Sequence, residues 1–179
     1  TDFPFYYVQL SSIDRPSWPA FRDAQNKIQN KIPNSGMAIS MDYGDSLNVQ
    51  PIKKKEVADR LALLALHYTY GKPVIANGPN PLKAVQKEDT IQISFAFAKQ
   101  LTTSDQKELI GFELVNDNGI RLQSKATINK NQVIINVPKD EKIRTVLYAW
   151  KAFTNANLVN EAGLPCSTFK LELNPTAEN

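Results

Sequence analysis

The sequence contains one histidine, one cysteine and no long apolar run, and each scarcity excludes a class of site. One histidine and one cysteine cannot furnish the three or four protein ligands of a zinc site, so we expect no metal site, and we expect no cofactor. A lone cysteine also rules out a disulfide within the chain, and Cys166 is expected to be a buried small hydrophobe. The longest apolar run, residues 61–66, is far shorter than the roughly 20 residues that span a membrane.

The sequence also lacks a large excess of charge of either sign. The 179-residue chain has a formal net charge of +3, spread evenly over its two halves. Its one basic run, residues 53–55, lies at the expected start of a helix, with no interleaved aromatic residue or glycine-rich loop. We interpret this run as a solvated helix face rather than a phosphate site. Balanced charge and 42% hydrophobic residues are typical of a soluble globular protein and argue against a nucleic-acid or acidic-lipid partner.

The first 77 residues alternate between strand and helix patterns. Residues 5–10 are rich in aromatic and β-branched residues, which predicts a buried strand, and residues 37–42 predict a second. Ser17 is the expected N-cap of the first helix, Gly71 closes the second, and residues 73–76 suggest a short third strand. The apolar stripes of the two helices are Phe21, Ala24, Ile28 and Ile32, and Val57, Leu61, Leu64 and Tyr68. This order implies a parallel sheet with crossover helices.

Past residue 77 the pattern changes to strict alternation. Ile91, Ile93, Phe95 and Phe97 are expected to share one buried face of a strand. Further strands are expected at residues 111–115, 120–128, 133–137, 145–150 and 168–173. Hairpin turns are expected at residues 118–119 and 130–131. The sequence therefore predicts an α/β portion at residues 1–77 and an all-β antiparallel sandwich at residues 78–179.

Residues 44–47 read G-D-S-L, the letters of an esterase signature in which the serine is the nucleophile. A nucleophile elbow needs a helix directly after the serine, whereas the next helix is expected only after Pro51. The one histidine, His67, lies within that helix, where a satisfied or half-exposed role is favoured over a general base. Asp42 and Asp45 follow a strand, where turn chemistry explains both. Ser46 is therefore not expected to be a nucleophile.

An ordered series of segments gives the chain a family resemblance. The segments are F-P-F-Y-Y-V-Q-L, F-R-D-A-Q, I-P-N-S-G-M-A-I-S-M-D-Y-G-D, V-A-D-R-L-A-L-L-A-L, L-Y-A-W and N-L-V-N-E-A-G-L-P. Together they resemble the C-terminal part of bacterial sialate O-acetylesterases of the SGNH (GDSL) hydrolase superfamily. The resemblance implies the last strands and helices of an SGNH-type parallel α/β sheet, followed by a β-sandwich.

In that family the segment after M-D-x-G-D continues toward D-I-H-P-K-N-K, in which the histidine is the catalytic base. Aligned on Gly44, Asp45 and Pro51, the resemblance assigns the histidine position to Gln50 and the acidic position to Asn48. A glutamine amide does not accept and return a proton near neutral pH, whereas an imidazole does. The chain alone is therefore predicted to be inactive.

The resemblance also implies partners and a location. The family's nucleophile and oxyanion residues lie near the start of its esterase domain and have no counterpart in this chain, which has no initiator methionine and looks like a processed product or fragment. We expect a missing N-terminal esterase segment to cover the sheet, and a periplasmic or extracellular location. Two functions stay open: an esterase acting on O-acetyl esters of sialic acid or related sugars, and a non-catalytic carbohydrate-binding relative.

Two further residues are weak candidates for substrate contact. Gln9 lies at the C-terminal end of the first expected strand, the edge where open α/β sheets bind ligands. Arg22, on the next helix, could orient a sugar carboxylate through a bidentate pair. A packing or solvent-facing role is the alternative for both residues.

Overall fold

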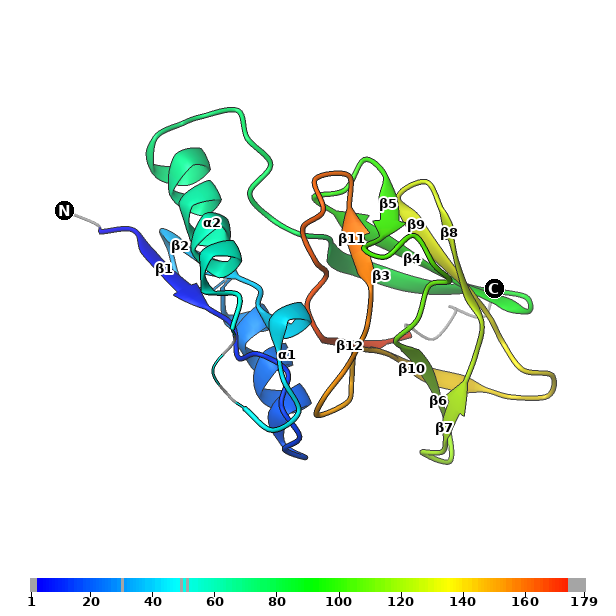
Figure 1. Ribbon diagram of the computed structural model, residues 1–179. Helices are drawn as coiled ribbons and strands as arrows, with labels where there is room; N and C mark the ends of the chain where they lie inside the picture. Colours follow the sequence, from blue (N-terminus) through cyan, green and yellow to red (C-terminus); the bar gives the residue numbers. More distant parts are fainter. Residues whose placement is uncertain (1–2, 30, 49, 51, 174–179) are drawn as a thin grey trace.

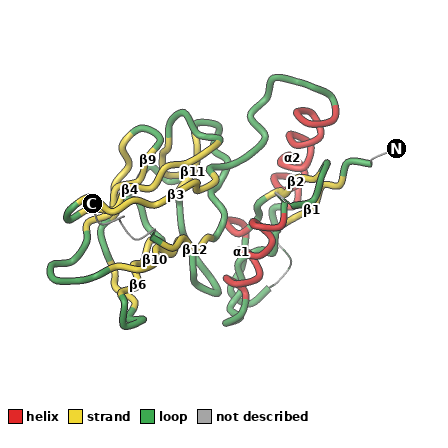
Figure 2. The backbone as a smooth tube through the Cα atoms, turned by 180° about the vertical axis from the view of Figure 1, so that it is seen from behind, coloured by secondary structure: helices red, strands yellow, loops and turns green. Residues whose placement is uncertain are grey.

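The protein is mostly antiparallel β-sheet with few helices (Figure 1). The computed structural model describes residues 3–29, 31–48, 50 and 52–173. Residues 3–70 form a part that we call the small lobe, which contains both α-helices, and residues 80–173 form the β lobe. Seen from behind in Figure 2, the helices gather on one side and nearly all of the strands on the other. No helix of the described residues is long and apolar enough to cross a membrane.

The β lobe contains two four-stranded antiparallel sheets and one strand pair. The first sheet has the order β3 (Asn80–Lys87), β4 (Thr90–Ala96), β9 (Gln132–Asn136), β8 (Ala126–Asn129). The second has the order β12 (Phe169–Glu172), β10 (Ile143–Tyr148), β6 (Phe112–Asn116), β7 (Arg121–Gln123). The pair consists of β5 (Leu101–Thr103) and β11 (Leu158–Asn160).

One hydrophobic core lies between these sheets. Ile91 and Ile93 of β4 are fully buried and pack in the same cluster as Tyr148 and Phe169 of the second sheet. The rings of Tyr148 and Phe169 are stacked with 5.4 Å between their centroids. The alternation that predicted a buried face in β4 is thus confirmed for three of its four residues. Phe97 is the exception, because β4 ends at Ala96 and Phe97 has a φ of +58° that turns its half-exposed ring out of the core.

Several expected strands of the β lobe have other bounds. Residues 120–128 are not one strand but two, since β7 pairs with β6 in one sheet and β8 pairs with β9 in the other. Residues 73–76 do not form a strand and belong to the loop between the lobes. Strands β3, β5 and β11 were not predicted, because β5 and β11 have only three residues each and the eight residues of β3 show no clear alternation of buried and exposed positions. Both predicted turns are present, with a φ of +77° at Gly119 and +55° at Lys130.

The small lobe begins with two parallel strands joined by a helix. Strand β1 (Phe5–Val8) pairs in parallel with β2 (Ser35–Ala38), and α1 (Trp18–Ile28) connects them. The turn η1 (Met41–Tyr43) lies where the second expected strand was to continue. Helix α2 (Lys54–Leu64) continues into the π-helical turn η2 (Ala65–Thr69) and ends before Gly71, which has a φ of +62° as the sequence predicted. The expected parallel pairing is present between these two strands.

Helix α1 presents the opposite face from the one that its apolar stripe predicted. Phe21 and Ile28 of that stripe are 55% and 46% exposed, whereas the polar residues Arg22, Asp23 and Asn26 are buried. The reason is that each buried polar residue has a partner in the β lobe. Asp23 accepts a hydrogen bond from the Lys170 backbone N–H, and Asn26 donates to the Asn80 side chain. Strand β1 was likewise expected to be buried, but Phe5 and Val8 are exposed.

Arg22 makes the most extensive polar contact between the lobes. Its side chain is fully buried, and its Nε donates to Thr168 Oγ1 at 2.8 Å. Its two terminal nitrogens donate to the backbone carbonyls of Ala149, Lys151 and Ala152 at 2.6–3.1 Å. Burial lowers the pKa of Arg22 from its ordinary value to about 10, so the guanidinium remains charged at neutral pH. Carbonyl dipoles therefore replace the water that this cation loses.

Replacing Arg22 tests whether this contact holds the lobes together. Arg22→Met keeps an unbranched apolar stem but leaves buried carbonyls without donors, so we expect a loss of about 3 kcal/mol or more of unfolding free energy. The matched control is Arg121→Met, because Arg121 has a half-exposed side chain and is expected to change stability by about 0.5 kcal/mol or less. Urea unfolding of both variants measures the difference. Equal stability of the two variants would contradict the contact's importance.

Candidate functional site

The loop between η1 and α2 contains the two residues aligned with the catalytic positions of the esterases. Asp45 Oδ1 accepts the backbone N–H groups of Leu47 and Asn48 at 2.8 and 3.0 Å. Asn48 Oδ1 in turn accepts the backbone N–H of Gln50 at 2.9 Å. The expected role of turn chemistry at Asp45 is therefore present. Val49 and Pro51, used in the alignment of this loop, lie outside the described residues.

Asn48 and Gln50 lie next to each other, both exposed. The Asn48 amide bonds to the backbone of Gln50 and not to its side chain, whereas Gln50 Oε1 accepts from Lys54 Nζ at 3.1 Å. Neither amide exchanges a proton near neutral pH. These two side chains therefore hold the Gln50 backbone and the Lys54 side chain, and they provide no general base.

The start of this loop, at residues 42–44, is anchored to neighbouring segments of the small lobe. Arg60 forms a bidentate ion pair with Asp42, with Nη1–Oδ1 and Nη2–Oδ2 distances of 2.7 and 2.6 Å, and donates to the Ile39 carbonyl. Its guanidinium also lies over the Tyr43 ring at 4.4 Å. Gly44 lies so close to the loop after β1 that a Cβ there would be 2.2 Å from the Ser12 carbonyl oxygen. These contacts fix where the exposed loop leaves the lobe.

Gln9 and Arg22 are brought together, and both are buried in packing between the lobes. Gln9 Nε2 donates to the Arg22 carbonyl at 3.1 Å and to Ser167 Oγ at 2.6 Å. Gln9 Oε1 has no hydrogen-bond partner among the described residues. Their geometry favours the packing alternative, and substrate contact by either residue stays a prediction.

Ser46, His67 and Cys166 have environments that fit the non-catalytic roles predicted for them. Ser46 is exposed in the loop, and the following helix begins only at Lys54. His67 is exposed on η2, with its ring against Tyr68 at 4.6 Å. Cys166 is fully buried, and burial raises the pKa of its thiol, which disfavours a reactive thiolate. Among the described residues, no group of His, Cys, Asp and Glu side chains could hold a metal ion.

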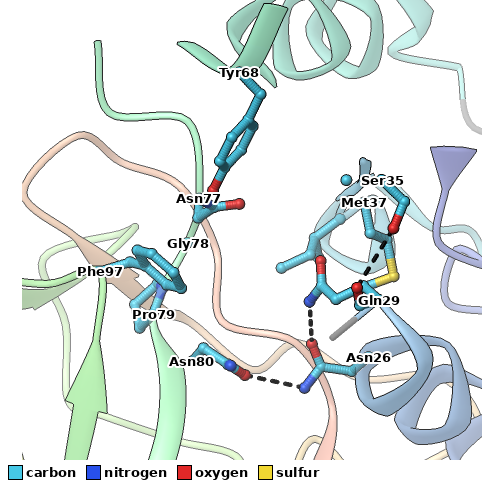
Figure 3. Close-up of a pocket in the computed structure, with 12 residues that line it drawn as sticks. Asn26, Gln29, Ser35, Met37, Tyr68, Asn77, Gly78, Pro79, Asn80 and Phe97 are labelled. Atoms are coloured by element: carbon cyan, nitrogen blue, oxygen red, sulfur yellow. Dashed lines mark hydrogen bonds between the residues drawn. The ribbon is translucent and has the colours of Figure 1, made fainter. Parts of the chain in front are cut away.

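The sequence did not predict the cavity of about 120 Å³ between the lobes shown in Figure 3. The amides of Asn26 and Gln29 line it, together with those of Asn77, in the linker of residues 71–79, and of Asn80, the first residue of β3. The rings of Tyr68 and Phe97 complete the lining. Asn26 Nδ2 donates to Asn80 Oδ1 at 3.2 Å, and Gln29 Nε2 donates to Asn26 Oδ1 at 3.0 Å (Figure 3). The cluster of asparagines at residues 77 and 80 was a possible signal, but it resembled an ordinary turn.

Comparison with known proteins identifies one informative neighbour. The fold is similar to the crystal structure of a carbohydrate acetylesterase from Xanthomonas citri, with a TM-score of 0.86 and 26% sequence identity. The similarity covers 93% of this chain, which spans 40% of the length of that protein's chain. No protein-family model matches the sequence. A search of curated proteins gave no match either.

Replacing Ser46 tests the G-D-S-L motif directly. Because Ser46 is exposed and has no helix directly after it, Ser46→Ala is expected to leave the rate of acetyl-ester hydrolysis by the longest natural form unchanged within about twofold. The measurement is acetate release from a soluble acetyl ester, with circular dichroism as the folding control. A large rate loss without loss of folding would make Ser46 a nucleophile after all.

Proposed function

We propose that this chain is a portion of a carbohydrate esterase of the sialate O-acetylesterase type, which hydrolyses O-acetyl esters on sialic acid or related sugars. The observation that carries the proposal is the similarity to a carbohydrate acetylesterase over 93% of the chain. The family resemblance in the sequence supports the same activity. Residues 1–77 then correspond to the C-terminal portion of an SGNH-type parallel sheet and residues 78–179 to an antiparallel β-sandwich. A periplasmic or extracellular location is part of the proposal.

The proposal assigns the position of the family's catalytic base to Gln50 and that of its acidic partner to Asn48. An exposed loop anchored by Arg60 and Asp42 supports this assignment, because a base must reach a substrate from a fixed backbone. The nucleophile and oxyanion donors come from a segment outside this chain. The chain by itself lacks the acid/base chemistry of the reaction.

That further segment also has a proposed place on the small lobe. In the described residues β1 pairs only with β2, so its other edge has unpaired backbone groups. Phe5, Phe21 and Ile28 leave large apolar side chains exposed on the same lobe. We propose that additional strands and helices of the esterase domain pair with β1 and cover these side chains. The chain's 40% share of the acetylesterase's length supports this arrangement.

A substitution of Phe21 tests the covering segment. If a segment covers Phe21, Phe21→Glu lowers the stability of the longest natural form by about 2 kcal/mol or more, because a buried aromatic side chain is lost and a charge is placed there. The isolated chain of residues 1–179 changes little, since its Phe21 is 55% exposed. Ile120→Glu is the control, because Ile120 is also 55% exposed but lies on the β lobe. Chemical unfolding of wild type and both variants in each form measures the effect, and an equal response of both forms to Phe21→Glu would contradict the covering segment.

A non-catalytic carbohydrate-binding protein is the second candidate function. The observation that favours it is the pair of neutral amides at Asn48 and Gln50, where the family has an acidic residue and a histidine. Loss of one triad member typically lowers turnover by several orders of magnitude. Such a protein would keep the fold and bind sugars without releasing acetate.

Restoring the family residues separates the two functions. If the longest natural form retains the nucleophile and oxyanion groups, Gln50→His is expected to raise acetyl release by about 10²-fold or more, because an imidazole can deprotonate the serine. The neighbouring Lys54 ammonium favours a neutral imidazole, the form that acts as a base. Asn48→Asp is expected to help only in combination, since a carboxylate acts by orienting the imidazole.

The measurement compares acetyl release at neutral pH by wild type, both single variants and the double variant. Gln50→Asn serves as the control, because it shortens the side chain without adding a base. Ordinary enzymatic turnover by wild type with no gain from Gln50→His would show that the base lies elsewhere. No turnover by any variant, with sugar binding intact, would favour the non-catalytic protein.

A further inference from the structure

Two cavities meet at Phe97. One is the cavity of about 120 Å³ between the lobes, and the other is a larger cavity of about 370 Å³. Phe97 and Asn77 line both cavities. His67, Ile75 and Glu161 belong to the lining of the larger cavity. Its volume is within the range of about 300–1,000 Å³ that is usual for small-molecule sites.

The backbone of Phe97 has a conformation that bulky residues rarely adopt. A bulky residue with a φ of +58° is a conformational outlier that costs about 1–3 kcal/mol. The strain leaves the ring 52% exposed, although the alternation of β4 would place it in the core. In Figure 3 the ring lies beside the smaller cavity, across from Gln29 and Asn26. Strained residues cluster at ligand-binding sites, and here the strained residue is one that lines both cavities.

Asn160 holds the backbone of Asn77 and Phe97, the two residues that line both cavities. It is fully buried on β11, and its Nδ2 donates to the carbonyls of Asn77 and Phe97, each at 2.9 Å. Its Oδ1 accepts the backbone N–H groups of Ala162 and Leu164 at 3.1 Å. One buried side chain, with both its donor and its acceptor atoms hydrogen-bonded, thus fixes the linker and the residue that follows β4. Preorganisation of this kind lowers the entropic cost of binding a ligand.

The smaller cavity has the polar chemistry of a sugar site. Its described lining residues include the amides of Asn26, Gln29, Asn77 and Asn80 and contain no charged side chain. An amide offers both a donor and an acceptor, as a sugar hydroxyl does. Asn77 Nδ2 donates to the Tyr68 hydroxyl, which places an aromatic ring beside the amides. The larger cavity adds one cation and one carboxylate, Lys99 and Glu161, whose formal charges cancel. Neutral amides and a lining without net charge favour an uncharged ligand over sialic acid or phosphate.

We propose that the two cavities that share Phe97 and Asn77 form a binding site for a neutral oligosaccharide, with the Phe97 ring stacking on a sugar face. The choice of a sugar among neutral polar ligands rests on the proposed function. The larger cavity takes a sugar unit, and the amide-lined cavity takes a polar substituent of it. The lining of neither cavity includes Asn48 or Gln50, so the site does not contain the proposed catalytic position.

The experiment measures binding of a fixed panel of unacetylated cellohexaose, xylohexaose and mannohexaose to the longest natural form by titration calorimetry. Wild type is expected to bind at least one of them, and Phe97→Gly to weaken that binding by about tenfold or more, because the stacking ring is lost. Phe97→Gly also relieves the strained φ, so its melting temperature is expected to stay equal or to rise by about 2–4 °C. A merely structural Phe97 would show a fall in melting temperature instead. Phe97→Trp, which keeps an aromatic face, is expected to retain binding.

Tyr70→Ala is the matched control, because Tyr70 is a 68% exposed aromatic residue outside both linings and is expected to leave affinity unchanged. Acetyl release from a small acetyl ester by wild type and by Tyr70→Ala tests the proposed function independently of oligosaccharide binding. Acetyl release without binding of any hexaose would overturn the site and leave the esterase proposal standing. Unchanged affinity in Phe97→Gly, or a structure of the longest form with its own polypeptide filling both cavities, would also overturn the site.

Discussion

The Arg22 guanidinium carries a positive charge into the contact between the lobes, and the placement of the small lobe depends on it. Its donors meet three backbone carbonyls and one hydroxyl of the β lobe. Because a buried cation is stable only when its donors are satisfied, the segment at residues 149–152 must remain in one conformation. Asp23 and Asn26 of the same helix face bind the β lobe too, which explains why a polar face of α1 is buried.

This orientation of α1 has two consequences for function. The apolar side of the helix is turned away from the β lobe, so Phe21 and Ile28 are available to further polypeptide. The amide side faces the linker, where Asn26 and Asn80 bridge the lobes and line the cavity beside Phe97. One helix thus connects the proposed esterase sheet, the β lobe and the proposed sugar site. Residues of both lobes line this cavity, so its shape depends on how the lobes are held together.

The two proposed sites differ in how they are built. Asn48 and Gln50 lie on an exposed loop whose root is fixed by the Arg60–Asp42 ion pair, so the backbone is placed while the side chains face solvent. The buried Asn160 amide binds the backbone carbonyls of Phe97 and Asn77, which fixes the position of the backbone from which the Phe97 ring extends. The exposed loop suits a site that another segment completes, whereas the fixed backbone at Phe97 suits a preformed pocket.

The sequence by itself determined the features that depend on local chemistry. The alternation of Ile91, Ile93 and Phe95 predicted a buried strand face, and positive-φ positions at Gly71, Gly119 and Lys130 end a helix or turn a hairpin as predicted. The neutral amide side chains at residues 48 and 50 do not act as a general base. Only the tertiary structure decided which face of α1 is buried, that residues 120–128 divide between two sheets, and that Phe97 leaves the core. Each of these depends on partners distant in sequence, such as Ala149 for Arg22 and Asn160 for Phe97, which override the local pattern of polarity.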